Sequence, residues 1–184
     1  MKKSLLGLTV SALFMVGAAH ATTNPNDASA TLNITGTVVQ DIANMCTVTL
    51  DKSTLRLSDT SIDKLITQGE DATSPEKVKL NISGGDDCST KVAAGTMAFK
   101  FTGLGDNADG TVMGNHVYDP ATAAQGVGVG IFDSQNKMVR LNSADYLVAS
   151  TTDTTIGLQM VKLNGKSPTP GLIDSTLTIE IQRL

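Results

Sequence analysis

The amino-acid sequence predicts an all-β protein built as a sandwich of two sheets. Short segments alternate between apolar and polar residues, turn-forming residues separate them at regular intervals, and strong helix signals are missing. Aromatic residues make up only 3% of the chain and Trp is absent, whereas Gly occurs 17 times. Seven or eight short strands at such a spacing are typical of a β-sandwich.

The first 21 residues have the pattern of a removable signal peptide. The positive pair Lys2-Lys3 precedes an apolar run at 5–18, and residues 19–21 (Ala-His-Ala) supply small side chains at the cleavage site. The alternative is a transmembrane anchor, which needs about 20 apolar residues, more than this run contains. We therefore expect an exported domain, residues 22–184, that does not insert into a membrane.

The first expected strand lies at 31–39, after a small and polar stretch at 22–30. One of its faces carries Leu32, Ile34, Gly36 and Val38, and the other carries Thr and Asn side chains. Six further strands are expected at 46–50, 54–58, 76–83, 97–102, 154–163 and 175–184, with a hairpin at 127–141 that turns through 134–136. The alternation thus predicts strands along nearly the whole chain.

Turn-rich stretches at 84–87, 103–110 and 164–171 separate these strands. The best helical window is 59–68, where Asp59 or Ser61 offers a cap but little apolar face follows. No internal repeat or interdomain linker is evident. The elements therefore predict one domain.

The two cysteines, Cys46 and Cys88, are expected to form a structural disulfide. Export makes a disulfide permissible, and no other cysteine competes. A separation of 42 residues excludes a CxxC redox motif, and a zinc site needs more Cys or His ligands than this chain has.

Composition argues against an enzyme, a cofactor and a nucleic-acid partner. The net charge of −4 becomes −6 when Lys2 and Lys3 leave with the signal peptide, so a basic footprint for nucleic acid is missing. His116 is then the single histidine, and although Tyr118 and Asp119 follow it, no nucleophile is placed by the sequence.

Four kinds of local motif invite functional interpretations that their context does not favour. The glycines at 126–130 lack the spacing of a phosphate loop and continue the alternation of a strand. Residues 106–110 lack the full pattern of a calcium loop and are expected to form a solvated turn. Asp86-Asp87 is expected to lie in a loop rather than to form a catalytic pair. Glycosylation sequons at Asn33 and Asn81 lie within expected strands and are treated as chance matches.

One feature does not fit a closed sandwich. The strand at 175–184 runs to the last residue, with Leu177, Ile179 and Ile181 on one face and no closing strand after it. An exposed edge above apolar side chains is an aggregation hazard. The extended N-terminal segment of a neighbouring molecule is able to fill such an edge by adding a strand.

This arrangement resembles the chaperone–usher pilins of Gram-negative bacteria, the subunits of type 1-like fimbriae. The resemblance rests on the signal peptide, the alternating extension around Gly36, the first cysteine ten residues later, and Cys88 after the run VKLNIS. Gly171 also stands fourteenth from the C-terminus, where the family usually has a glycine. Arg183 departs from the family pattern, in which the penultimate residue is usually aromatic.

The resemblance implies an incomplete immunoglobulin-like sandwich that lacks its last strand, with residues 22–39 as an N-terminal extension and 40–184 as the pilin domain. Leu32, Ile34, Gly36 and Val38 would insert into a groove of the preceding subunit. The groove and chaperone contacts would include Gly171, Leu177, Ile179, Ile181, Arg183 and Leu184. A periplasmic chaperone would grip the carboxylate of Leu184, and an outer-membrane usher would assemble the subunits into a cell-surface fimbria that supports adhesion.

Two alternatives remain open at this point. A self-complete secreted β-sandwich would bind a ligand or carbohydrate as a monomer, and residues 31–39 would then pair within their own chain. A periplasmic enzyme is disfavoured by the histidine content.

Overall fold

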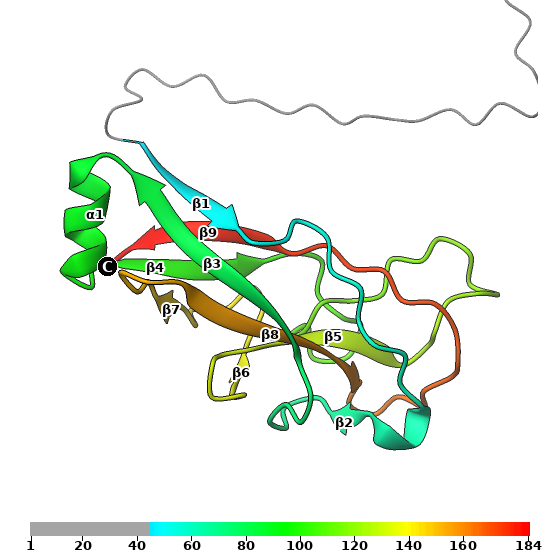
Figure 1. The fold of residues 1–184 in the computed structure, drawn as a ribbon. Coiled ribbons are helices and arrows are strands. Elements are labelled where there is room, and N and C mark those ends of the chain that lie inside the picture. The colour runs from blue at the N-terminus through cyan, green and yellow to red at the C-terminus, as the bar shows by residue number, and fades with distance from the viewer. Residues whose placement is uncertain (1–44) are drawn as a thin grey trace, which may run out of the picture. The chain divides into compact units, whose positions relative to one another are not determined.

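A computed structural model describes residues 45–184 as two facing β-sheets, which confirms the predicted all-β sandwich (Figure 1). The larger sheet has the order β1-β3-β8-β5-β6, with the short β2 beside β8, and the smaller has the order β7-β4-β9. Every pairing is antiparallel except that of β2 with β8.

The strands of the larger sheet are β1 (Cys46–Leu50), β2 (Ile66–Thr67), β3 (Glu76–Gly84), β5 (Val127–Phe132), β6 (Met138–Val139) and β8 (Thr154–Lys162). Those of the smaller sheet are β4 (Met97–Thr102), β7 (Leu147–Val148) and β9 (Thr178–Arg183). A 3-10 helix at Ile62–Lys64 and the helix α1 (Asp86–Ala93) complete the described elements.

The apolar faces predicted for the central strands form the core between the sheets. In β3 the side chains of Val78, Leu80 and Ile82 are buried while Lys77 and Lys79 are exposed. From the facing sheet, β4 contributes buried Met97, Phe99 and Phe101 to the same cluster. Burying each such side chain is worth about 1.5–3 kcal/mol, so the alternation that predicted these strands also stabilises them.

The disulfide Cys46–Cys88 forms as expected, but the segment around Cys88 is a helix rather than the predicted turn. The two Cα atoms are 5.7 Å apart, and the bond joins the start of β1 to α1. The helix α1 begins at Asp86, where Asp86 and Asp87 face the positive end of the helix dipole. Cys88 and Val92, four residues apart, are buried, so the helix covers one end of the core.

The strand predicted at 54–58 is absent from the structure. The Asp51 carboxylate accepts the N–H of Lys79 at 2.8 Å and thereby ends the pairing of this segment with β3. Leu55 and Leu57 still pack against the core, which explains the alternation without a ladder. The window 59–68 forms only the 3-10 turn and β2, because it lacks an apolar face to bury.

The predicted hairpin at 127–141 is confirmed as β5 and β6. The Asp133 carboxylate accepts the N–H groups of Gln135 and Lys137, both at 2.8 Å, and Asn136 adopts a positive φ of 65°. Asn tolerates this left-handed conformation better than other non-glycine residues, so the turn residues read from the sequence fix the register.

The loop at 103–110 differs from the expected solvated turn because Asp106 is only 9% exposed. Its carboxylate accepts the N–H groups of Ala108 at 2.7 Å, Asp109 at 3.0 Å and Val112 at 3.1 Å. It also accepts Gln68 Nε2 at 3.0 Å, which ties the loop to the residue after β2. Burial raises the pKa of Asp106, but the backbone N–H donors, Val112 first, outweigh burial and hold the pKa below its ordinary value of 3.8.

The disulfide should dominate the stability of the β1 end. Replacing Cys46 and Cys88 together by Ala should lower the free energy of unfolding by about 4 kcal/mol, because the unfolded chain loses a loop closure of 42 residues. Urea unfolding of the two proteins measures the difference, and wild type under reducing conditions is the control. A loss below about 1 kcal/mol in both tests would contradict this role.

Asp106→Asn should lower the free energy of unfolding at neutral pH by roughly 2 kcal/mol, because an amide nitrogen then faces N–H donors. Since the folded pKa of Asp106 is depressed, its contribution is present above about pH 4 and is lost as pH falls through the folded value. Urea unfolding across this range should show the gap between variant and wild type closing in acid. Asp59→Asn, at an exposed position, is the matched control. A gap independent of pH would refute the assignment.

Candidate functional site

Two unpaired strand edges lie side by side in the described part of the molecule. Among the strands of residues 45–184, β1 pairs only with β3, and β9 pairs only with β4. β1 and β9 run next to each other in opposite directions, one from each sheet (Figure 1). Arg183 Nη2 lies 4.0 Å from Cys46 Sγ, which brings the end of β9 to the start of β1. We call these two facing edges the β1–β9 seam.

The seam is bordered by apolar side chains that the core covers only in part. They pack against the core cluster and are half-buried: Val48, Leu55 and Leu57 from the β1 side, and Leu177, Ile179 and Ile181 from the β9 side. In contrast, Phe99 and Phe101, the β4 partners of Ile181 and Ile179, are completely buried. The expected alternation of the last strand is therefore present. The apolar side chains of β9 are less buried than their partners in β4.

The seam also offers backbone hydrogen-bonding groups. Successive N–H and C=O groups of a strand point to alternate sides, and the β4 ladder uses those on one side of β9 from Thr178 to Arg183. Groups on the other side have no ladder partner among the described strands. An edge of this kind is a template for an added strand.

The remaining residues expected at the groove lie at the two ends of this segment. The Leu184 N–H donates to the Thr96 carbonyl at 2.9 Å, so the last residue continues the line of β9. Gly171 lies seven residues before β9, where an added Cβ would come within 2.3 Å of Ala124 N. Close approach of two backbones thus requires glycine there. The expected donor residues Leu32, Ile34, Gly36 and Val38 lie outside the described residues.

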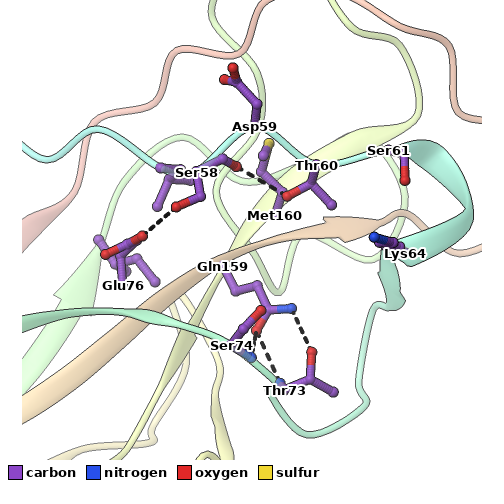
Figure 2. Close-up of a pocket in the computed structure, with 12 residues that line it drawn as sticks. Ser58, Asp59, Thr60, Ser61, Lys64, Thr73, Ser74, Glu76, Gln159 and Met160 are labelled. Atoms are coloured by element: carbon purple, nitrogen blue, oxygen red, sulfur yellow. Dashed lines mark hydrogen bonds between the residues drawn. The ribbon is translucent and has the colours of Figure 1, made fainter.

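A separate hollow of about 690 Å³ lies between the segment 57–64 and β8 (Figure 2). Its polar groups bond to one another: Ser58 Oγ donates to Glu76 Oε1 at 2.6 Å, and Gln159 Oε1 accepts the N–H groups of Thr73 and Ser74 at 3.0 Å. Part of the polar lining is therefore committed to structural bonds, and none of the lining residues is a histidine or cysteine.

The side chains of the residues that suggested acid–base chemistry are not hydrogen-bonded to one another in the described structure. His116 donates its backbone N–H to Asp174 O at 2.7 Å, and its buried Nε2 has no hydrogen-bond partner in the described structure. The Asp119 carboxylate accepts the N–H of Ala121 at 3.0 Å, and the Tyr118 side chain is fully exposed. Asp86 and Asp87 lie in the first turn of α1 rather than in a loop.

Residues 45–184 contain no group of three or more His, Cys, Asp or Glu side chains placed to hold a metal ion. Within the same range, no helix has the length and apolarity needed to cross a membrane.

Comparison with known proteins decides the family. A model of the fimbrial protein family matches residues 32–182, which include β1 and all of β9 except Arg183. The chain belongs to the fimbrial protein family. This fimbrial protein is therefore assigned to a family of structural subunits of cell-surface fibres and not to a family of enzymes.

Individual relatives agree with the assignment. The fimbrial protein is 26% identical to the fimbrial subunit type 1 of Salmonella typhimurium over 186 aligned positions, which covers 97% of each chain. Its fold is similar to that of the P pilus rod subunit PapA, with a TM-score of 0.53, 13% identity, and coverage of 85% of this chain and 100% of that one. A subunit from the structure of a chaperone–usher pilus gives a TM-score of 0.51 at 16% identity, with 89% and 100% covered. These likenesses confirm the expected pilin fold.

Asn115 is a structural residue that sequence reasoning missed. Its Nδ2 donates to Ala124 O at 2.9 Å and Leu172 O at 2.8 Å, while Oδ1 accepts the N–H groups of Val117 and Asp174. The side chain of one polar residue thus joins the loop after β4 to the segment before β9. Nothing in the local sequence indicates these partners, because Leu172 and Asp174 are almost 60 positions away.

Proposed function

We propose that this fimbrial protein polymerises by donor-strand exchange, in which residues 31–39 of one subunit fill the β1–β9 seam of the preceding one. The observation that carries the proposal is the position of β9. It has a free edge beside the free edge of β1, and half-buried apolar side chains lie along it. An alternating segment that supplies both a ladder and apolar side chains satisfies both sides of this seam.

The lengths and periods of the two segments agree. Residues 32–38 span about 20 Å when extended, and the stretch 177–183 along the seam has the same number of residues. With period two, Leu32, Ile34 and Val38 all face the core, and Gly36 faces it where no side chain is accommodated. A slip of one residue would turn Thr side chains inward, so the register is specified.

The donor strand in this proposal runs antiparallel to β9. β9 offers the longer free edge, because it extends from Thr178 to Arg183 whereas β1 ends at Leu50. Antiparallel ladders are slightly more stable per residue than parallel ones. The N-terminal end of the donor strand then lies near Arg183, and Val38 lies near the segment that precedes β9.

Export and assembly follow from the same feature. A free apolar seam is an aggregation hazard, so a periplasmic chaperone covers it until an outer-membrane usher exchanges the chaperone for the next subunit. The chaperone holds the carboxylate of Leu184, a residue that is half exposed at the end of β9. Arg183 places a positive charge beside that carboxylate in place of an aromatic ring. The assembled fimbria lies on the cell surface, where it supports adhesion.

Ile34→Glu in the mature chain should abolish donation while leaving the seam of the same subunit intact, because burying an unpaired carboxylate in the neighbour costs several kcal/mol. The variant alone should remain monomeric. Added to wild type, it should accept the free donor segment at the end of a growing fibre and, because it cannot donate in turn, stop growth there and shorten the fibres in proportion to its share. Fibre length by electron microscopy and subunit mass by size-exclusion chromatography measure the effect.

The matched control is Thr35→Glu, at the neighbouring position on the opposite face of the predicted strand. It should polymerise as wild type does, because its side chain faces solvent in the assembled fibre. If Ile34→Glu also polymerises normally, donor-strand exchange through residues 31–39 is wrong. A wild-type protein that stays a stable monomer would instead favour the self-complete sandwich.

A further inference from the structure

Three strongly exposed apolar side chains lie on segments that the fold brings together. Tyr118 is fully exposed, and Leu104 and Leu172 are 65% and 63% exposed, more than any other large hydrophobic residue described. Single exposed apolar residues are ordinary, but an apolar group on a fixed surface marks an interaction site. We call these three residues the end patch.

Hydrogen bonds hold the backbone beneath the end patch. The N–H of Gly114 donates to Leu104 O at 3.0 Å, and the next residue, Asn115, donates from its side chain to Leu172 O at 2.8 Å. Leu172 O also accepts the N–H of Ala124 at 2.8 Å. The same Asn115 side chain accepts the N–H of Val117, next to Tyr118. The patch is therefore presented by a preorganised set of loops, which lowers the entropic cost of docking.

The end patch continues the β1–β9 seam at its end away from Arg183. Leu172 is followed by Ile173 and Leu177, which pack against the core and lead directly into β9. Gly103, beside Leu104, approaches the same segment so closely that an added Cβ would lie 2.9 Å from Thr176 O. Both leucines therefore lie where the seam begins along the chain direction of β9.

This inference rests on the proposed function. A donor strand antiparallel to β9 leaves the seam at the end patch, and the body of its own subunit begins at Cys46. The chain from Val38 to Cys46 reaches at most about 28 Å, so the body of the donor subunit must lie close to this end. We infer that the end patch is the docking surface for the body of a second copy of this chain, which adds a contact between folded domains to the inserted strand.

The experiment separates this contact from the strand insertion. The patch variants are Leu104→Ser with Leu172→Ser, and Tyr118→Ser alone, each in the full mature chain. Because these side chains are already exposed, thermal unfolding should be unchanged. The control is Tyr146→Ser, an exposed tyrosine before β7. The first measurement is the affinity of a synthetic peptide of residues 28–39. It uses chains that also carry Ile34→Glu, so that they cannot donate their own strand. The second measurement is the rate of fibre growth, and it uses chains with Ile34 unchanged.

The patch variants should bind the peptide with wild-type affinity but extend fibres about tenfold more slowly, since a few residues carry most of the binding energy of an interface. Tyr146→Ser should match wild type in both measurements. Normal peptide binding with wild-type fibre growth in the patch variants would overturn the docking surface, as would an equal slowing by Tyr146→Ser. If the peptide binds none of the chains, donor-strand exchange itself fails, which is a different outcome from loss of the patch contact.

Discussion

The hydrogen-bonding capacity of β9 is the constraint on which the other features depend. A backbone N–H or C=O group without a partner is tolerated where water reaches it, but Ile179 and Ile181 beneath this edge favour exclusion of water. No change of side chains could both give these backbone groups hydrogen-bond partners and keep water away from the two isoleucines. Only an added strand supplies a ladder and apolar cover together, which is why we propose β9 as an assembly site as well as part of the core.

The disulfide and α1 give this edge a fixed opposite wall. Cys46 is the first residue of β1, and its bond to Cys88 ties the start of that strand to a helix packed on the core by Val92. Without that tether, β1 would be held only by its ladder to β3, and the position of the seam wall would vary. A preformed seam costs less entropy to fill than one that must be ordered by the incoming strand.

Prediction from sequence succeeded where a local period decided the structure. β3 and β4 were predicted because alternate residues such as Val78 and Phe99 meet the core on one face. The same pattern misled at 54–58, where Leu55 and Leu57 reach the core without a ladder. The helix α1 was missed because its cap is Gly85 and only Cys88 and Val92 are buried. Asp106 and Asn115 were beyond local reasoning, since Gln68 and Leu172 meet them only in the folded chain.

The two ends of the seam differ, and this gives the proposed assembly a direction. At one end Arg183 lies beside the disulfide, and at the other the end patch presents Leu104 and Leu172. A strand from one copy that enters the seam of another joins two unlike surfaces, so the contact is heterologous rather than two-fold symmetric. In the proposed assembly, the short reach from Val38 to Cys46 keeps the donor body at the far end of the acceptor, where its own seam stays open for the next strand. Heterologous contacts that do not close produce an open fibre, so donor-strand exchange through this seam would produce a polymer rather than a closed dimer.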